Sequence, residues 1–131
     1  MNEQKTQIWN TSKVANRLVE LCRIGENMQA INELYDQNIV SKEMSGMPND
    51  VIRGKDAVIK KTNDWYATVE EFHGSEISEP MVADSHFSCT MKMDCTFKGQ
   101  GRMKIEELAV YNVNNGKITE EQFFYSMPSS E

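Results

Sequence analysis

The chain has 131 residues, of which 39% are hydrophobic and 26% are charged, and it carries a formal net charge of -6. That length fits one domain, so we expect residues 1–131 to fold as a single unit around one core. The acidic balance argues against nucleic acid or an anionic membrane as the main partner, because both bind basic surfaces. No apolar run approaches the length of a membrane span and the first residues contain no signal-peptide core, which predicts a cytoplasmic location.

Two short amphipathic helices are expected at the start of the chain. In the first, which Gly25 stops, hydroxyl residues that can cap a helix precede apolar residues at helical spacing. These residues are Thr11, Ser12, Val14, Leu18, Leu21 and Cys22. The second helix, over residues 26–36, repeats the pattern with Met28, Ile31, Leu34 and Tyr35. A short strand over residues 38–45 and a loop are expected to follow.

A longer helix is predicted after Gly54. Its apolar stripe, which must be buried, consists of Val58, Thr62, Trp65, Val69 and Phe72. His73 and Gly74 end this helical pattern. From residue 76 the apolar period changes to two, which predicts strands, and Pro80 within the first of them (residues 77–83) is typical of an edge or a bulge.

Residues 86–97 alternate between apolar and polar types. One side carries Phe87, Cys89, Met91, Met93, Cys95 and Phe97, which indicates a strand with one apolar face. The chain then turns at residues 98–101. A two- or four-residue loop would place Met93 opposite Glu106 and Met91 opposite Leu108, whereas a three-residue loop would reverse this parity. We favour the first register because it keeps apolar side chains beside one another.

The segment 103–127 predicts a β-hairpin, because Asn115 and Gly116 suit the positive φ angles of a two-residue turn. With that turn, Asn114 pairs with Lys117, Val113 with Ile118, Val110 with Glu121, Leu108 with Phe123 and Glu106 with Tyr125. One face is then predicted to line a pocket and carries Glu106, Leu108, Val110, Glu121, Phe123, Tyr125 and Met127. The other is predicted to meet a partner subunit and carries Ile105, Glu107, Ala109, Tyr111, Glu120, Gln122 and Phe124.

The order of the elements predicts an α+β fold, in which three N-terminal helices pack on one face of an antiparallel sheet. We expect this sheet to be strongly curved, giving a cone-shaped α+β barrel. The depth of the cavity inside it would depend on the bulk of the side chains.

Three segments carry a family resemblance. They are VIRGKDAVIKKTNDWY with its glycine before the long helix, SEISEPMVADSHFSCTMKMD in the entering strands and NVNNGKITEEQFFY in the closing hairpin. With the paired opening helices, this pattern resembles the nuclear transport factor 2-like superfamily, and within it the SnoaL-like group, over nearly the whole chain. The resemblance implies a dimer formed through the outer sheet face and a small-molecule pocket on the inner one.

The resemblance implies a fold more than an activity, because this fold hosts isomerases, cyclases, dehydratases, hydrolases and non-catalytic binding proteins. In the polyketide cyclases that the chain resembles, a catalytic aspartate stands a few residues after the Gly-Lys-Ile turn, and Phe123 holds that place here. In the ketosteroid isomerases the acid of the preceding strand projects inward near the position of Val110. Both places are apolar in this sequence.

Glu106 and Tyr125 are predicted to face each other on the pocket side, with Cβ atoms about 5 Å apart. A carboxyl group among apolar neighbours has its pKa raised by desolvation, as a general acid or base requires. We therefore predict three catalytic residues: Glu106 as acid or base, Tyr125 as its hydrogen-bonding partner and Glu121 as a second polar contact. The alternatives are a structural hydrogen bond between Glu106 and Tyr125, and carboxylates that simply reach solvent.

Seven further residues are predicted to bind the ligand: Tyr35, Trp65, Met91, Met93, Leu108, Val110 and Phe123. Aromatic side chains with a polar group suit a mostly apolar ligand that needs one or two hydrogen bonds, and methionine gives an adaptable wall. Ordinary core packing is the alternative for each of them.

Neither a metal site nor a cofactor is expected, because the sequence contains no H-E-x-x-H, no C-x-x-C and no glycine-rich phosphate loop. The three cysteines are expected to be reduced. Cys89 and Cys95 cannot pair within one strand, where they would lie roughly 20 Å apart.

Together these patterns favour a cytoplasmic homodimer of the SnoaL-like type, whose pocket binds a small organic molecule and acts on it by cofactor-free proton transfer. Tyr111 and Phe124 on the outer face favour contact between two sheets, and a solvated sheet is the alternative. The competing hypothesis for function is a non-catalytic ligand carrier or a protein-interaction module that acts through its sheet.

Overall fold

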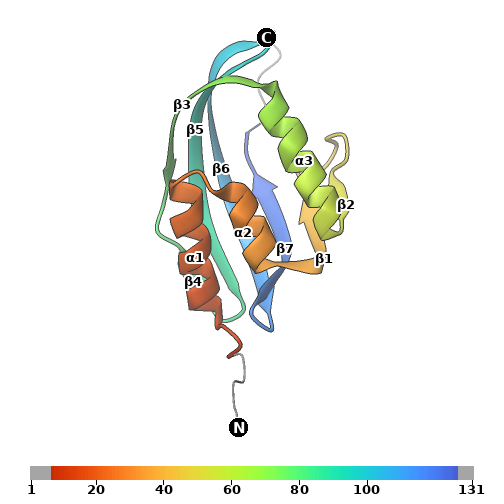
Figure 1. Cartoon of the computed structure of the whole chain (residues 1–131), viewed down its shortest axis with the longest axis vertical. Helices are drawn as coiled ribbons and strands as arrows, with labels where there is room; N and C mark the ends of the chain where they lie inside the picture. Colours follow the sequence, from red (N-terminus) through yellow and green to blue (C-terminus); the bar gives the residue numbers. More distant parts are fainter. Residues whose placement is uncertain (1–6, 127–131) are drawn as a thin grey trace.

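The computed structural model describes residues 7–126, which contain three α-helices and seven β-strands (Figure 1). The helices are α1 (Thr11–Arg23), α2 (Asn27–Leu34) and α3 (Lys55–Thr68). The strands are β1 (Tyr35–Lys42), β2 (Val51–Arg53), β3 (Val69–Ile77), β4 (Met81–Ala83), β5 (His86–Phe97), β6 (Gly101–Asn114) and β7 (Lys117–Phe124). Met127, which we expected on the closing hairpin, lies outside the described residues.

The seven strands form one sheet in the order β2-β1-β7-β6-β5-β3, with β4 paired to β5. All pairs are antiparallel except β1 and β7, which are parallel. The α+β class is therefore confirmed, but the sheet is mixed and, since β2 and β3 remain its ends, it is not closed into a barrel. A short hairpin forces antiparallel pairing, and no hairpin joins β1 to β7, which lie far apart in the sequence.

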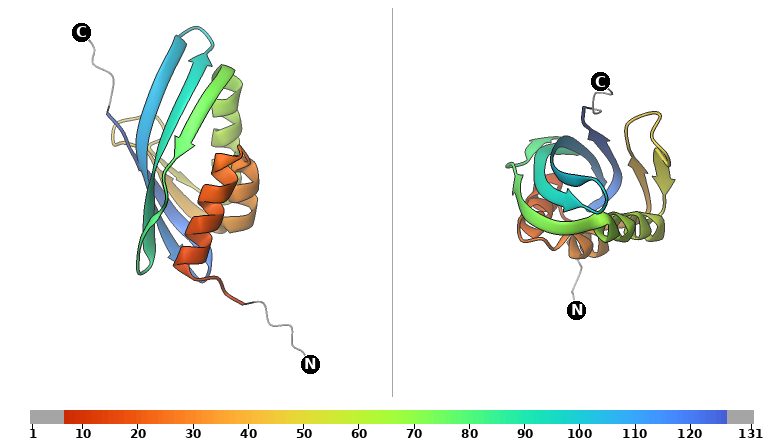
Figure 2. Two further views of the ribbon diagram at one scale, coloured as in Figure 1. Left: turned by 90° about the vertical axis from the view of Figure 1, so that its left-hand side faces the viewer. Right: turned by 90° about the horizontal axis from the view of Figure 1, so that it is seen from above.

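All three helices lie on one side of the sheet (Figure 2). Helix α1 packs against α2, β3 and β5, whereas α3 packs against β1 and β2. The N-cap of α1 is Asn10 rather than Thr11 or Ser12, and its side chain accepts a hydrogen bond from the backbone N of Lys13 at 2.8 Å. Gly25, with φ of 80°, follows the helix end as expected.

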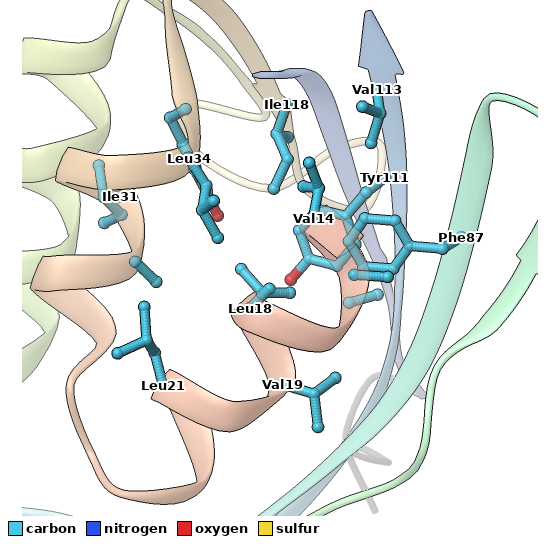
Figure 3. Close-up of a cluster of buried hydrophobic side chains, with 14 of the residues drawn as sticks. Val14, Leu18, Val19, Leu21, Ile31, Leu34, Phe87, Tyr111, Val113 and Ile118 are labelled. Atoms are coloured by element: carbon cyan, nitrogen blue, oxygen red, sulfur yellow. The ribbon is translucent and has the colours of Figure 1, made fainter. Parts of the chain in front are cut away.

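The apolar stripes of α1 and α2 and the inner face of the sheet form the hydrophobic core (Figure 3). From the helices it includes Val14, Leu18, Val19, Leu21, Ile31 and Leu34, and from the sheet Phe87, Tyr111, Val113 and Ile118. The aromatic rings of Phe87 and Tyr111 stack with their centroids 4.7 Å apart. This core fills the half of the molecule under α1 and α2, so the region between α3 and the sheet is packed less completely.

Two predicted helix ends were wrong. Tyr35, expected in the second helix, begins β1, and Val69 and Phe72, expected on the long helix, lie in β3 because α3 ends at Thr68. Val69 pairs with Phe97 and Phe72 with Cys95, so backbone pairing with β5 replaces the helix there. A β-branched and an aromatic residue fit either element, and the long-range pairing decides between them.

The two hairpins set which side chains face inward. Phe97 pairs with Gly101, so the β5–β6 loop has three residues, and the favoured two- or four-residue loop was wrong. The predicted turn at Asn115 and Gly116 is confirmed, with Asn114 paired to Lys117 and positive φ at both turn residues.

A β-bulge follows this turn. Val113 pairs with Ile118 but Asn112 pairs with Glu120, which leaves Thr119 as an extra residue on β7. The Oγ1 of Thr119 donates a hydrogen bond to Oδ1 of Asn112 at 2.8 Å. Beyond the bulge every pairing is shifted by one residue from the one that we predicted, since Tyr111 rather than Val110 is opposite Glu121.

Candidate functional site

A large cavity of about 1910 Å³ opens between the helices and the inner face of the sheet. Its wall comes from the C-terminal half of α1, the connection to α2 and α2 itself, and from α3, β3, β5, β6 and β7. Six methionines line it: Met28, Met44, Met47, Met91, Met93 and Met103. Flexible thioether side chains give a wall that can adapt to the shape of an apolar ligand.

Nine of the ten predicted site residues line this cavity, and seven of them lie outside β6: Tyr35, Trp65, Met91, Met93, Glu121, Phe123 and Tyr125. Trp65 comes from α3, where its ring packs edge-on against Phe97. Their placement agrees with the predicted pocket face of β5 and β7. Their participation in binding or catalysis stays a prediction.

The predicted inward face of β6 was wrong. On β5, Glu106 is opposite Lys92 and not Met93; its side chain is 67% exposed and its carboxylate lies 3.9 Å from the Lys92 amine. Leu108, which is 40% exposed, pairs with Phe124, and Val110 pairs with Gln122. Glu106 and Leu108 border the cavity, but the three side chains alternate with the inward ones and so point to the outer face.

The residues that β6 does turn inward are those that we assigned to the outer face. Ala109 and Tyr111 are buried, and Glu107 lines the cavity. The reason is the three-residue β5–β6 loop, because adding one residue to a loop exchanges the two faces of the strand that follows. Strand β7 kept its predicted orientation because the extra residue Thr119 exchanges the faces a second time.

Glu107 is the carboxyl group that this register brings into the cavity. It lies opposite Met91 of β5, and no hydrogen bond joins its side chain to another of the residues 7–126. Burial raises the pKa of Glu107 to about 7, and the neighbouring carboxyl groups of Glu43 and Glu121 add to the increase. The Lys61 amine opposes this effect only in part.

Glu121 is 3% exposed and lies deeper in the cavity wall. Its two carboxyl oxygens accept hydrogen bonds from the hydroxyl of Tyr35 and from that of Ser41, the latter at 2.7 Å. Burial raises the pKa of Glu121, while the two hydroxyl donors act in the opposite direction. Two residues of the neighbouring strand β1 therefore hold the Glu121 side chain in one orientation.

Glu43 connects α3 to the end of β7. One of its oxygens accepts a hydrogen bond from the Lys61 amine at 2.5 Å, and the other accepts one from the hydroxyl of Tyr125 at 2.8 Å. Lys61 also lies 3.4 Å from the hydroxyl of Ser41. These contacts join the two carboxyl groups of Glu43 and Glu121 in one polar network on the cavity wall.

Tyr111 adds a hydroxyl at the inner end of the cavity. It is 2% exposed, yet its hydroxyl forms no hydrogen bond with any other residue between 7 and 126. The ring projects from β6 toward the helices (Figure 3) and lines the cavity beside Glu121, its partner on the neighbouring strand β7. A buried hydroxyl that faces a cavity can bind a polar atom of a ligand.

Five polar residues of this site were missed in the sequence: Ser41, Glu43, Lys61, Glu107 and Tyr111. The signal that could have found Glu107 is the spacing of Gly99 and Gly101, both at positive φ, which is typical of a three-residue hairpin loop. Ser41, Glu43 and Lys61 carry no such signal, because the hydrogen bonds that join them to one another and to the end of the chain link residues far apart in the sequence.

The cysteines are free thiols. Burial raises the pKa of Cys22 to about 12 and that of Cys89 to about 11, so both stay protonated near neutral pH. Within residues 7–126, no three His, Cys, Asp or Glu side chains gather in a way that could hold a metal ion. In the same part of the chain, no helix is long and apolar enough to cross a membrane.

The SnoaL-like domain model matches residues 9–125, so the chain belongs to the SnoaL-like domain family. It is 33% identical to a proposed SnoaL-like polyketide cyclase from Mesorhizobium loti, with a TM-score of 0.82, over 89% of this chain and 100% of that one. A comparison with curated proteins gave no match.

Two more distant structures share the fold. One is a nuclear transport factor 2-like protein of unknown function from Burkholderia pseudomallei, with 11% identity, a TM-score of 0.73, and coverage of 87% of this chain and 88% of that one. The other is a hypothetical protein with a ketosteroid isomerase-like fold from Catenulispora acidiphila, solved in complex with trimethylamine. Its identity is 16% and its TM-score 0.69, over 88% of this chain and 86% of that one. The resemblance seen in the sequence is confirmed.

Proposed function

We propose that the cavity binds a small, largely apolar organic molecule and that Glu107 transfers a proton to or from it without a cofactor. The observation that carries this proposal is the position of Glu107 on the cavity wall, with a pKa near 7 and no hydrogen-bonding partner among residues 7–126. A general acid or base works best when its pKa lies near the working pH. The reaction types that fit are isomerisation, cyclisation and dehydration.

The neighbouring groups support this role for Glu107. The hydroxyl of Tyr125 and the amine of Lys61 are held by Glu43, and Glu121 is held by Tyr35 and Ser41. Fixed polar groups around a single free carboxyl group allow a ligand to be oriented against it. Met91, Met93 and Phe123 give the same cavity an apolar wall beside that carboxyl group.

The test compares substitutions of two adjacent glutamates, Glu106 and Glu107, in the turnover of a ligand. The ligand comes from a small-molecule library screened by thermal shift, since a ligand that binds only the folded protein raises the melting temperature. We expect E107Q to lower turnover of a hit by about 100-fold or more and to remove the titration near pH 7 from its pH-rate profile. The matched control E106Q, on the opposite face of the same strand, should keep both. Equal turnover in E107Q and the wild-type protein would remove Glu107 from the mechanism.

A second candidate function uses the outer sheet face. Leu108 and Phe124 are directly paired there and are 40% and 41% exposed, with Val110 beside them. An exposed apolar pair on the outer sheet face suits an isologous homodimer. Light scattering of wild-type protein and F124S tests this, and a monomer at micromolar concentration in both would contradict it.

A further inference from the structure

The inner part of the cavity has more acidic than basic groups. Three carboxyl groups, those of Glu43, Glu107 and Glu121, share it with one amine, that of Lys61, and this amine already pairs with Glu43 at 2.5 Å. The remaining charged residues along the cavity do not reverse the balance, because two are basic and three are acidic: Arg23, Lys104, Glu26, Asp64 and Glu106. The site should therefore attract a cationic ligand, because its one amine is already paired with a carboxylate.

A separate observation also indicates a bound ligand. Tyr111 is 2% exposed, and its hydroxyl, which lies near Glu121 and Tyr35 at the inner end of the same cavity, has no hydrogen-bonding partner within residues 7–126. A buried polar group without a partner costs stability, and a polar atom of a ligand would remove that cost.

The strand geometry gives the distance between these two groups. Glu107 and Tyr111 stand four residues apart on the inner face of β6, which corresponds to about 13 Å between their Cα atoms. Ala109 lies between them and is fully buried, so neighbouring side chains cover the strand at that point and the cavity reaches Glu107 and Tyr111 on either side of it. The face toward α3 is closed by the ring of Phe123, over which the Lys61 amine lies 5.6 Å from the centroid.

We propose that the ligand is an amine with an apolar body, whose ammonium group pairs with Glu107 and whose opposite end places an oxygen atom against the hydroxyl of Tyr111. This inference rests on the proposed function and adds the chemical class of the ligand. The ammonium supplies the positive charge that Glu107 lacks, and the apolar body contacts Met91, which pairs with Glu107 across the sheet. Glu43 and Glu121 lie close enough to strengthen the attraction.

The pH dependence of binding follows from the groups that face Glu107. These are Glu43, which follows β1; Lys61 of α3; Glu121 of β7 and Tyr125, which follows that strand; and Cys89 of β5. Since the pKa of Glu107 is about 7, its charge is absent at pH 5 and present at pH 8.5. An alkyl ammonium keeps its charge throughout this range. The affinity for an amine should therefore rise between pH 5 and pH 8.5, whereas the affinity for a neutral ligand should not.

Four probes with the same ring test the two ends separately. They are 4-(2-aminoethyl)phenol, with both groups; 2-phenylethylamine, with the amine alone; 4-ethylphenol, with the hydroxyl alone; and 3-(4-hydroxyphenyl)propanoate, with a carboxylate. Calorimetric titration at pH 8.5 should give the first compound roughly 10- to 100-fold tighter binding than 4-ethylphenol. The carboxylate should bind most weakly, because it meets the acidic groups.

Variants assign each end of the ligand. E107Q should remove the advantage of the amine over 4-ethylphenol, Y111F should remove the advantage of the phenol over 2-phenylethylamine, and E106Q should change neither. Retained melting transitions confirm that the variants are folded. Equal affinity of the wild-type protein for the amine and for 4-ethylphenol, or no binding of the amine, overturns the inference. The first of these outcomes leaves the binding cavity of the proposed function intact, whereas a library screen without any hit contradicts both.

Discussion

The substitution E107Q should stabilise the protein at high pH and leave its stability unchanged at low pH. In the unfolded chain the Glu107 carboxyl ionises near its ordinary pKa of 4.5, and in the folded protein near 7. The folded state therefore binds the proton more tightly, and the stability that this provides is complete below pH 4.5 and is lost as the pH rises through 7. Raising the pKa from 4.5 to about 7 corresponds to about 3 kcal/mol.

Glutamine has nearly the same shape and no charge, so E107Q removes this loss. At pH 8.5 the variant should exceed the wild-type protein by up to about 3 kcal/mol in the free energy of unfolding, or roughly 10 °C in melting temperature. At pH 4 the two proteins should be equal. Urea denaturation at a series of pH values measures the difference, and E106Q, whose side chain is mostly exposed, serves as the control. A difference that does not depend on pH would refute the burial of the Glu107 carboxyl group.

Three further predictions concern the supports of the site. Y35F removes the hydroxyl donor to buried Glu121 and should lower the free energy of unfolding by about 1–3 kcal/mol in urea denaturation, whereas no change would mean that this hydrogen bond contributes nothing. G116A should destabilise the protein more than G99A, although both glycines have φ of 76°. A Cβ at Gly116 would lie 3.0 Å from the backbone N of Trp9, whereas one at Gly99 would meet nothing within 4 Å. Equal melting temperatures of the two variants would contradict this. The thiols of Cys22 and Cys89 should react with iodoacetamide at pH 8 only in denaturant, and rapid labelling of the folded protein would contradict their raised pKa values.

Much of the fold could be predicted from the sequence because its signals are local. Strand β5 coincides with the predicted residues 86–97, since alternation over twelve residues has one interpretation. The turn at Asn115 and Gly116 was equally clear, because few other residue pairs adopt two positive φ angles. The end of α3 was not clear, because only pairing with β5 decides whether Val69 and Phe72 belong to a helix or a strand.

Only part of the candidate site could be predicted, because an odd or even number of residues in each loop or bulge decides which face of the next strand turns inward. One residue more or less in a loop decides whether Glu106 or Glu107 faces the cavity, and each of these glutamates has one apolar neighbour in the sequence. The bulge at Thr119 then restored the predicted orientation of Glu121, Phe123 and Tyr125 on β7. The contacts of Ser41, Glu43 and Lys61 arise from the pairing of β1 with β7, which joins segments about 80 residues apart, as in the bond from Ser41 to Glu121. No local pattern encodes such a pairing.

The most direct test of the account is the proton affinity of Glu107 itself. In protein labelled with ¹³C at the glutamate carboxyl carbons, an NMR pH titration compared with that of E107Q identifies the Glu107 resonance as the one that the variant lacks. This resonance should titrate near pH 7, and addition of an apolar amine should move its midpoint to lower pH. A midpoint near the ordinary glutamate value of 4.5 would show that Glu107 is solvated and would contradict the proposed site.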